Sequence, residues 1–164
     1  MTIEEQIIEK IGNRYPALKE TYRVARKRRI FGEVSAELFN DFFQFAKNDL
    51  GFVSLVCIAG TDENERLAAL YSLAAENGIL LNVRRYVPVE NPVLPSVTGI
   101  YPNADYYERE LVDLLGFIVE GLQPGPRYPL PDDWPKGQYP LRKSWRPEML
   151  RDSSLNDDTE LQSK

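Results

Sequence analysis

The stretch that decides the fold runs from Arg66 to Glu90 and reads RLAALYSLAAENGILLNVRRYVPVE. Its centre, Asn77-Gly78, is a strong signal for a tight hairpin turn, because both residues tolerate a positive φ. The half after the turn is rich in β-branched and aromatic residues and indicates a strand. The half before it contains leucine and alanine, which would also suit a helix. The turn decides between these readings, and we predict two antiparallel strands that meet at Asn77-Gly78.

The segment just upstream, FVSLVCIAG (52–60), is short, apolar and bounded by glycines, which predicts a central strand. Its cysteine, Cys57, is the only one in the chain, and we expect it to fill the core. One thiol cannot hold a structural zinc ion or an iron–sulfur cluster, each of which needs about four ligands. The chain also has no histidine, the commonest general base. Any redox centre would therefore lie in another protein.

Two helices are predicted further upstream. The first begins at Ile3, places isoleucines at helical spacing and has Gly12 as a stop. The second begins with Ser35 as its N-cap and ends at Gly51. Between them, KETYRVARKRRIFGEVSAE alternates loosely between apolar and charged residues, which predicts a polar hairpin with one exposed face.

The composition changes after Pro88, because eleven of the twelve prolines lie from that residue onward. One short helix, ADYYERELVDLLG, is predicted before Gly116 closes it, and an extended path follows from Gly121. We predict an α+β domain (1–121) with a mixed or antiparallel sheet and helices packed on one face. A long extended proline-rich C-terminal arm (122–150) and a polar mobile tail (151–164) complete the chain.

Charge and hydropathy narrow the classes of function. The net charge is −5, which gives no overall attraction to nucleic acid or to anionic membranes. The longest apolar run is far shorter than the roughly 20 residues that cross a bilayer. The acidic, amphipathic N-terminus does not resemble a signal peptide, so an intracellular, soluble chain is expected.

A basic cluster is the one feature that could contact phosphates or an acidic protein face. No nucleic-acid-binding motif surrounds it, and few aromatic residues are available for stacking. The alternative interpretation is a charged outer strand that discourages aggregation at a sheet edge. The cluster consists of Lys19, Arg23, Arg26, Lys27, Arg28 and Arg29.

The triplet Glu108-Arg109-Glu110 lies in the predicted helix before Gly116. Arg109 and Asp113 are four residues apart and can pair, while Glu108 falls in the first turn, where the helix dipole favours an acid. The triplet could be a catalytic carboxylate pair, a solvated face or a docking surface. No second carboxylate motif supports catalysis by glycoside hydrolysis.

The arm offers aromatic anchors and positive charge, which protein interfaces favour. Trp134, Tyr139 and Trp145 supply the rings, and Arg142 and Lys143 supply the charge. The arm could lie across a partner, or it could wrap over its own domain.

Two ordered stretches, LPSVTGIYPNADYYERELVDLLG (94–116) and LPDDWPKGQYPLRKSW (130–145), resemble the hydrophilic 30-kDa subunit of respiratory complex I and its hydrogenase relatives. The chain departs from the family pattern at Tyr106, where tryptophan is usual, at Tyr139, where histidine is usual, and at Ser144, where an acid is usual. These departures indicate a distant branch: energy-converting, membrane-bound nickel–iron hydrogenases or related sulfur-reducing complexes. A quinone-reducing dehydrogenase is the alternative.

The resemblance implies a scaffold subunit without catalytic residues, cofactor or metal of its own. Its partners would be the large catalytic subunit and the small iron–sulfur subunit, which hold the nickel–iron centre or iron–sulfur clusters. The complex would lie at the cytoplasmic face of the membrane and would translocate ions. This chain would contact the membrane only through its partner subunits. The implied partner-facing residues are Glu108, Arg109, Glu110, Asp113, Trp134, Tyr139, Leu141, Arg142, Lys143 and Trp145.

Overall fold

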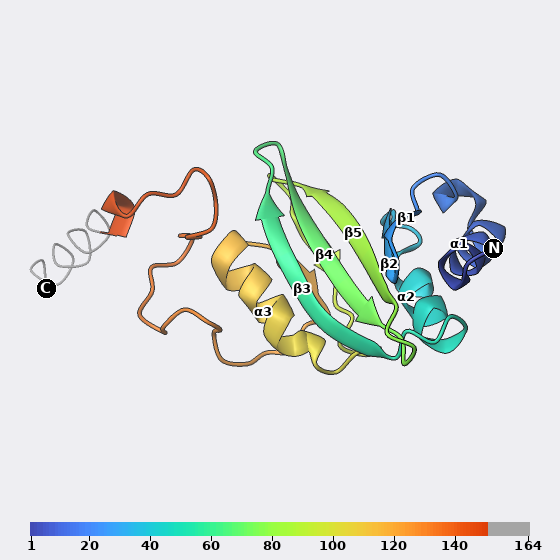
Figure 1. The fold of residues 1–164 in the computed structure, drawn as a ribbon. Helices are drawn as coiled ribbons and strands as arrows, with labels where there is room; N and C mark the ends of the chain where they lie inside the picture. The colour runs from blue at the N-terminus through green and yellow to red at the C-terminus, as the bar shows by residue number, and fades with distance from the viewer. Residues whose placement is uncertain (151–164) are drawn as a thin grey trace, which may run out of the picture.

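The computed structural model describes residues 1–150, and the predicted polar tail, 151–164, lies outside the described residues. Figure 1 shows a twisted sheet with helices beside it. The elements are α1 (Ile3–Arg14), a 3₁₀ turn η1 (Pro16–Leu18), β1 (Arg23–Arg26), β2 (Arg29–Glu33), α2 (Phe39–Asn48), β3 (Ser54–Asp62), β4 (Arg66–Ala74), β5 (Leu80–Pro88), β6 (Val93–Pro95), α3 (Ala104–Leu115) and β7 (Ile118–Glu120).

The hairpin predicted at Asn77-Gly78 is confirmed. β4 and β5 pair antiparallel from Ala74 opposite Leu80 to Arg66 opposite Pro88. Gly78 has a φ of +80°, a left-handed conformation that glycine adopts without strain. This hairpin forms the middle of a five-stranded sheet with the order β1-β2-β5-β4-β3.

The sheet is mixed, which is one of the two arrangements predicted from the sequence. β1 and β2 form the expected polar hairpin, and β2 then pairs with β5 in parallel. β3 is an edge strand and not the predicted central strand. Its apolar character has another cause, because one of its faces packs against α3. A second, two-stranded parallel sheet joins β6 to β7.

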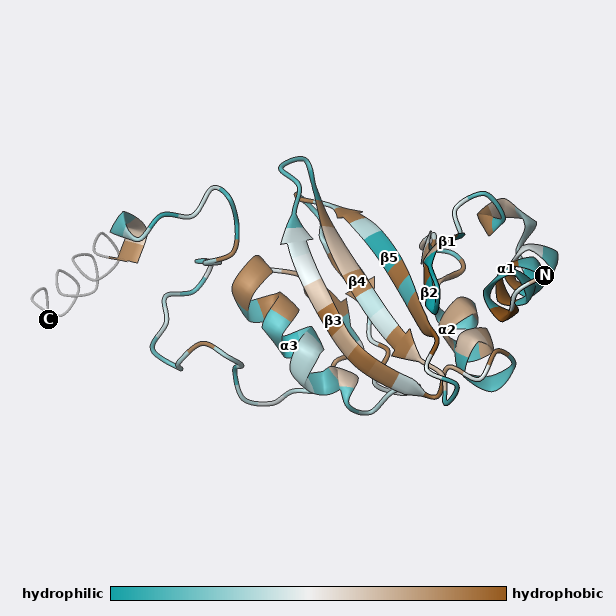
Figure 2. Cartoon of the chain, in the orientation of Figure 1, coloured by the Kyte–Doolittle hydropathy of each residue, from teal (hydrophilic) through white to brown (hydrophobic). Residues whose placement is uncertain are grey.

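Two of the helices, α2 and α3, pack on the same face of the main sheet, while α1 lies against η1 and β1. Tyr71 of β4 contacts the rings of Phe39 and Phe43 in α2. On the same face, a Cβ added to Gly60 of β3 would lie 2.3 Å from the side chain of Leu115 in α3. The register places Gly60 opposite Ala69, two residues from Tyr71, so α2 and α3 share this face. Figure 2 shows the resulting apolar and polar bands along the strands.

Three local predictions are wrong. α1 runs through Gly12 to Arg14, since Gly12 is buried and gives room to the side chain of Lys19. α2 begins only at Phe39 with Leu38 as its N-cap, so Ser35 does not cap it. Cys57 is only partly buried and does not fill the core. None of the helices within residues 1–150 combines the length and the apolarity needed to cross a bilayer.

Candidate functional site

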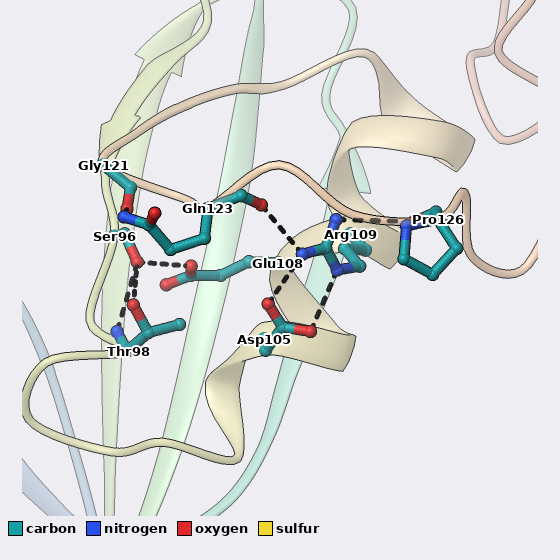
Figure 3. A network of polar contacts seen from close by, with 8 residues as sticks. All are labelled: Ser96, Thr98, Asp105, Glu108, Arg109, Gly121, Gln123 and Pro126. Carbon is teal, nitrogen blue, oxygen red and sulfur yellow. Dashed lines mark hydrogen bonds and ion pairs between the residues drawn. The ribbon is translucent and has the colours of Figure 1, made fainter.

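The triplet Glu108-Arg109-Glu110 lies in α3, which ends as predicted at Gly116 with a φ of +69°. Glu108 points into the molecule and is only 1% exposed. Its carboxylate accepts a hydrogen bond from Ser96 Oγ at 2.7 Å (Figure 3). It accepts another from the Val97 amide, also at 2.7 Å. Burial raises the pKa of Glu108, although these two donors oppose the shift. Glu108 therefore fixes the loop before α3 and offers no charge to the surface.

Arg109 points away from the buried side of α3, about 100° around the helix from Glu108, and binds its own chain at three places (Figure 3). Its guanidinium donates to both carboxylate oxygens of Asp105 at 2.9 Å. It also donates to the carbonyl oxygens of Gln123 at 2.9 Å and Pro126 at 3.4 Å. The predicted pair with Asp113 does not form, because the acid one turn earlier and the carbonyl groups of the arm occupy the guanidinium. Arg109 thus holds the beginning of the arm.

Asp113 holds the arm at a second place. It is buried, and its carboxylate accepts from Arg127 Nε at 3.1 Å and from the Leu130 amide at 3.2 Å. Arg127 in turn donates to the carbonyl oxygen of Trp134 at 2.8 Å. No local pattern in the sequence predicts this pair, because Asp113 and Arg127 belong to segments joined by an irregular loop.

Of the triplet, only its last residue, Glu110, remains available on the outer face of α3. Glu110 is partly exposed and, among the described residues, has no hydrogen-bond or ion-pair partner. Tyr106, one turn earlier, is 64% exposed and touches the ring of Tyr128 edge-on at 5.6 Å between centroids. We call Tyr106, Glu110 and Tyr128 the outer strip of α3. A carboxylate pair for catalysis is not formed, since Glu108 is buried and Glu110 faces outward.

The later part of the arm returns to the end of α3. The Leu141 amide donates to the Leu114 carbonyl oxygen at 3.0 Å, and Arg142 Nε donates to the Leu115 carbonyl oxygen. The Lys143 amide donates to Asp62 at 2.9 Å, at the end of β3. Burial would raise the pKa of Asp62, but the amides of Lys143 and Asn64 outweigh it and lower that pKa.

The two tryptophans of the arm lie next to each other, with ring centroids 6.0 Å apart. Trp134 Nε1 donates to the Gln138 carbonyl oxygen at 2.9 Å, and Trp145 Nε1 donates to the Gln138 side chain at 3.0 Å. Tyr139 packs on Gly116, where an added Cβ would fall 2.5 Å from the ring. Leu141 remains 54% exposed. The arm therefore folds on itself and on α3, and it presents Leu141 and Lys143 outward.

No three histidine, cysteine, aspartate or glutamate side chains within residues 1–150 come together as a metal site. The features that the structure does build are an α+β domain with a five-stranded mixed sheet and a C-terminal segment fastened to its last helix. Together they define a class of α+β proteins in which the last helix and the C-terminal segment form one continuous surface.

The family model of the respiratory-chain NADH dehydrogenase 30 Kd subunit matches residues 33–149. The chain is 31% identical over 150 residues to a subunit of the NADH-quinone oxidoreductase of Salinispora arenicola, covering 86% of this chain and 60% of that protein. It is 27% identical to the membrane-bound hydrogenase subunit beta of Pyrococcus furiosus over 148 residues, covering 87% and 86%. A chain of the membrane-bound sulfane sulfur reductase, an archaeal respiratory membrane complex, superposes with a TM-score of 0.79 at 27% identity, covering 92% and 89%.

The chain belongs to the family of the 30-kDa subunit of respiratory-chain NADH dehydrogenase. The resemblance drawn from the two C-terminal stretches is thereby confirmed. Relatives with this fold occur in NADH-quinone oxidoreductases, in a membrane-bound hydrogenase and in a sulfane sulfur reductase. The chain spans 60% of the length of its relative from Salinispora arenicola.

Proposed function

We propose that this chain is a scaffold subunit in the peripheral arm of a membrane-bound, ion-translocating oxidoreductase complex. It docks on the large catalytic subunit, does no chemistry itself and binds no cofactor. Nickel–iron or iron–sulfur centres belong to its partners, and the chain lies at the cytoplasmic face of the membrane through them. Its membership of the 30-kDa family and the names of its relatives support this proposal.

The observation that carries the proposal is that some charged residues of α3 bind the arm while another faces outward. Arg109 and Asp113 are both occupied by the arm, while Glu110 faces outward without a partner among the described residues. The ion pairs thus set the position of the arm, and the surface left for a partner is the outer strip of α3 with Leu141 and Lys143. A rigid, preorganised segment loses less entropy on binding, so fastening the arm favours docking.

The outer strip has the composition that interfaces prefer. Two exposed tyrosine rings meet at its centre, and large aromatic side chains with few rotatable bonds are common binding anchors. The single unpaired carboxylate beside them would fix the orientation of a bound partner more than it would raise the affinity for it. Among the implied partner-facing residues, Glu108, Arg109 and Asp113 then act indirectly, through the loop and the arm that they hold.

Purification of the complex in mild detergent through a tag on this chain tests the proposal. Glu110→Lys and Leu141→Asp should each reduce the large subunit recovered per tagged chain, and Glu110→Ala should reduce it less. Ile3→Asp is the matched control, since Ile3 on α1 is as exposed as Leu141, at 55% and 54%. Arg142→Ala should also weaken recovery, because its side chain holds the arm to Leu115. Recovery of the wild-type chain alone would contradict the proposal.

The branch of the family is decided in the same fraction. Nickel with iron and a large subunit bearing Cys-x-x-Cys pairs would establish the hydrogenase type, which the relative from Pyrococcus furiosus supports. Iron without nickel would indicate the equivalent subunit of a sulfur-reducing or quinone-reducing complex. The sulfane sulfur reductase chain, with its TM-score of 0.79, favours the sulfur-reducing form of this second candidate.

A further inference from the structure

The β1–β2 hairpin carries a concentration of positive charge that the proposed docking surface does not use. We call its five cationic residues the basic hairpin. Four of them are exposed and the fifth is partly exposed. None of the five forms an ion pair with an acid within residues 1–150, although the chain as a whole carries a net charge of −5. The five residues are Arg23, Arg26, Lys27, Arg28 and Arg29.

The backbone under these charges is fixed. The Arg28 amide donates to the carboxylate of Glu4 in α1 at 2.7 Å, and the Leu80 amide donates to the Arg28 carbonyl oxygen at 3.0 Å. Arg28 itself has a φ of +61° in this turn. Glu4 is buried, so it supports the turn without covering the cations around it. The charges are therefore presented on a preorganised element, which lowers the entropy lost on binding.

The basic hairpin and the α3 surface lie at opposite edges of the sheet. β1 is one edge strand, and β3, which packs against α3, is the other. Neighbouring strands are about 4.8 Å apart, so the four spacings between these edges amount to roughly 19 Å. Figure 1 shows β1 and β2 on the side away from α3 and the arm. A contact made by the outer strip of α3 does not extend to the basic hairpin.

The chemistry of the hairpin favours carboxylates over nucleic acid. Four of the five cations are arginine, whose planar guanidinium pairs with a carboxylate or a phosphate through two hydrogen bonds, so the choice between them depends on the aromatic residues available for stacking. Few rings are available to stack on a base, because Tyr22 is 5% exposed and packed on Phe42, and Phe31, opposite Arg23, is only partly exposed. Val24, at 37% exposed, is the one large apolar side chain exposed in β1.

We infer that the basic hairpin is a second docking surface and binds an acidic protein surface within the assembled complex. The inference rests on the proposed function, because it needs an assembly around the chain. It adds a contact on the opposite edge of the sheet from α3. The chain then bridges two surfaces, and its sheet sets the distance between them.

Carbodiimide cross-linking of the purified complex tests the inference, because this reagent joins an amine to a carboxylate that touches it. Lys27 is the only lysine of the basic hairpin. Mass spectrometry should find Lys27 joined to an aspartate or glutamate of another subunit. Lys27→Arg keeps the charge and should abolish the cross-link while every subunit stays in the complex. Cross-links from Lys27 only to acids of its own chain would overturn the inference.

Charge reversal supplies the second measurement. Arg26→Glu should make the acidic partner dissociate from the basic hairpin roughly tenfold faster in moderate salt, since a favourable charge pair becomes repulsive. Lys10→Glu on α1 makes the same change of charge outside the hairpin and is the matched control. The large subunit should stay bound in both variants. Its absence from the wild-type preparation would instead be a failure of the proposed function.

The same variants test whether the basic hairpin binds nucleic acid or an anionic membrane instead of a protein. Binding of the isolated wild-type chain to heparin, or to vesicles containing phosphatidylserine, with loss in Arg26→Glu and no cross-link in the complex, would overturn the acidic-protein assignment. An Arg26→Glu complex with unchanged composition and stability in salt would overturn it as well.

Discussion

Gly125 lies directly on the guanidinium of Arg109: a Cβ at this glycine would fall 2.6 Å from Nη2 and 2.8 Å from Cζ. The arm passes so close to α3 because Arg109 donates hydrogen bonds to the carbonyl oxygens of Gln123 and Pro126, on either side of this glycine. The guanidinium cannot simply move away, since Asp105 holds it through two hydrogen bonds. Position 125 thus controls whether the arm starts on α3.

Gly125→Ala should release the first part of the arm. The added methyl group would push the arm away from Arg109 and break its bonds to the arm, because Asp105 holds the guanidinium on α3. Hydrogen–deuterium exchange should rise at residues 122–130 and stay unchanged in β4 and β5. Gly99→Ala is the control, because nothing lies within 4 Å of a Cβ there. Equal exchange in the two variants would contradict the close contact.

Asp113→Asn should loosen the second fastening point. The change removes the charge that Arg127 pairs with, and a hydrogen bond to a charged group contributes about 1.5–3 kcal/mol. Arg127 is partly exposed and regains water, so we expect a loss of about 1 kcal/mol in the free energy of unfolding measured in urea. Limited proteolysis should cut the variant faster within the arm. An unchanged cleavage rate would show that Asp113 does not hold it.

Glu108→Gln should remove a dependence of stability on pH. Burial raises the pKa of Glu108 in the folded chain above its unfolded value of about 4.3. Its contribution to stability is therefore fully present below that unfolded value and is lost as the pH rises through the folded pKa. Glutamine has no proton to lose, so the stability of the variant relative to wild type should increase with pH over this interval.

Urea unfolding of both proteins at a series of pH values from about 4 upward measures this difference. Glu110→Gln is the matched control, since it removes a carboxylate from the outer surface of the same helix. A difference between Glu108→Gln and wild type that stays constant with pH would contradict the role of burial.

Tyr22→Phe should stabilise the chain. The hydroxyl group of Tyr22 is buried and has no hydrogen-bond partner among the described residues, and such a group costs about 1–3 kcal/mol. We expect the free energy of unfolding to rise by about 1 kcal/mol. Tyr101→Phe is the opposite control, because the Tyr101 hydroxyl donates to the buried Phe52 carbonyl oxygen at 2.8 Å and its removal should destabilise. A destabilised Tyr22→Phe would reveal an unseen partner.

Local signals predicted the elements that local chemistry controls. Asn77-Gly78 located the central hairpin, and Gly116 located the end of α3, because both depend on backbone conformations that few residues adopt. Spacing alone could not choose the partner of Arg109, since Asp105 and Asp113 are each four residues away. The carbonyl groups of the arm made that choice.

The rest depended on contacts between distant residues. The parallel pairing of β2 with β5 has no local signature, and it placed β3 at the edge of the sheet. The burial of Glu108 depends on Ser96 and Val97, which approach only after the loop has folded over α3. The family pattern identified the triplet as important without revealing that only Glu110 faces outward.

The parallel pairing of β2 with β5 also has a consequence for protein synthesis. The β1–β2 hairpin leaves the ribosome long before β5 exists, so one edge of β2 has no strand to pair with during that interval. Unpaired edges promote aggregation, and clustered positive charge opposes it. The same arginines that we infer bind an acidic partner in the finished complex would keep the nascent chain soluble. Ribosome-bound chains ending at residue 76 should aggregate more in Arg26→Ala/Arg29→Ala than in wild type.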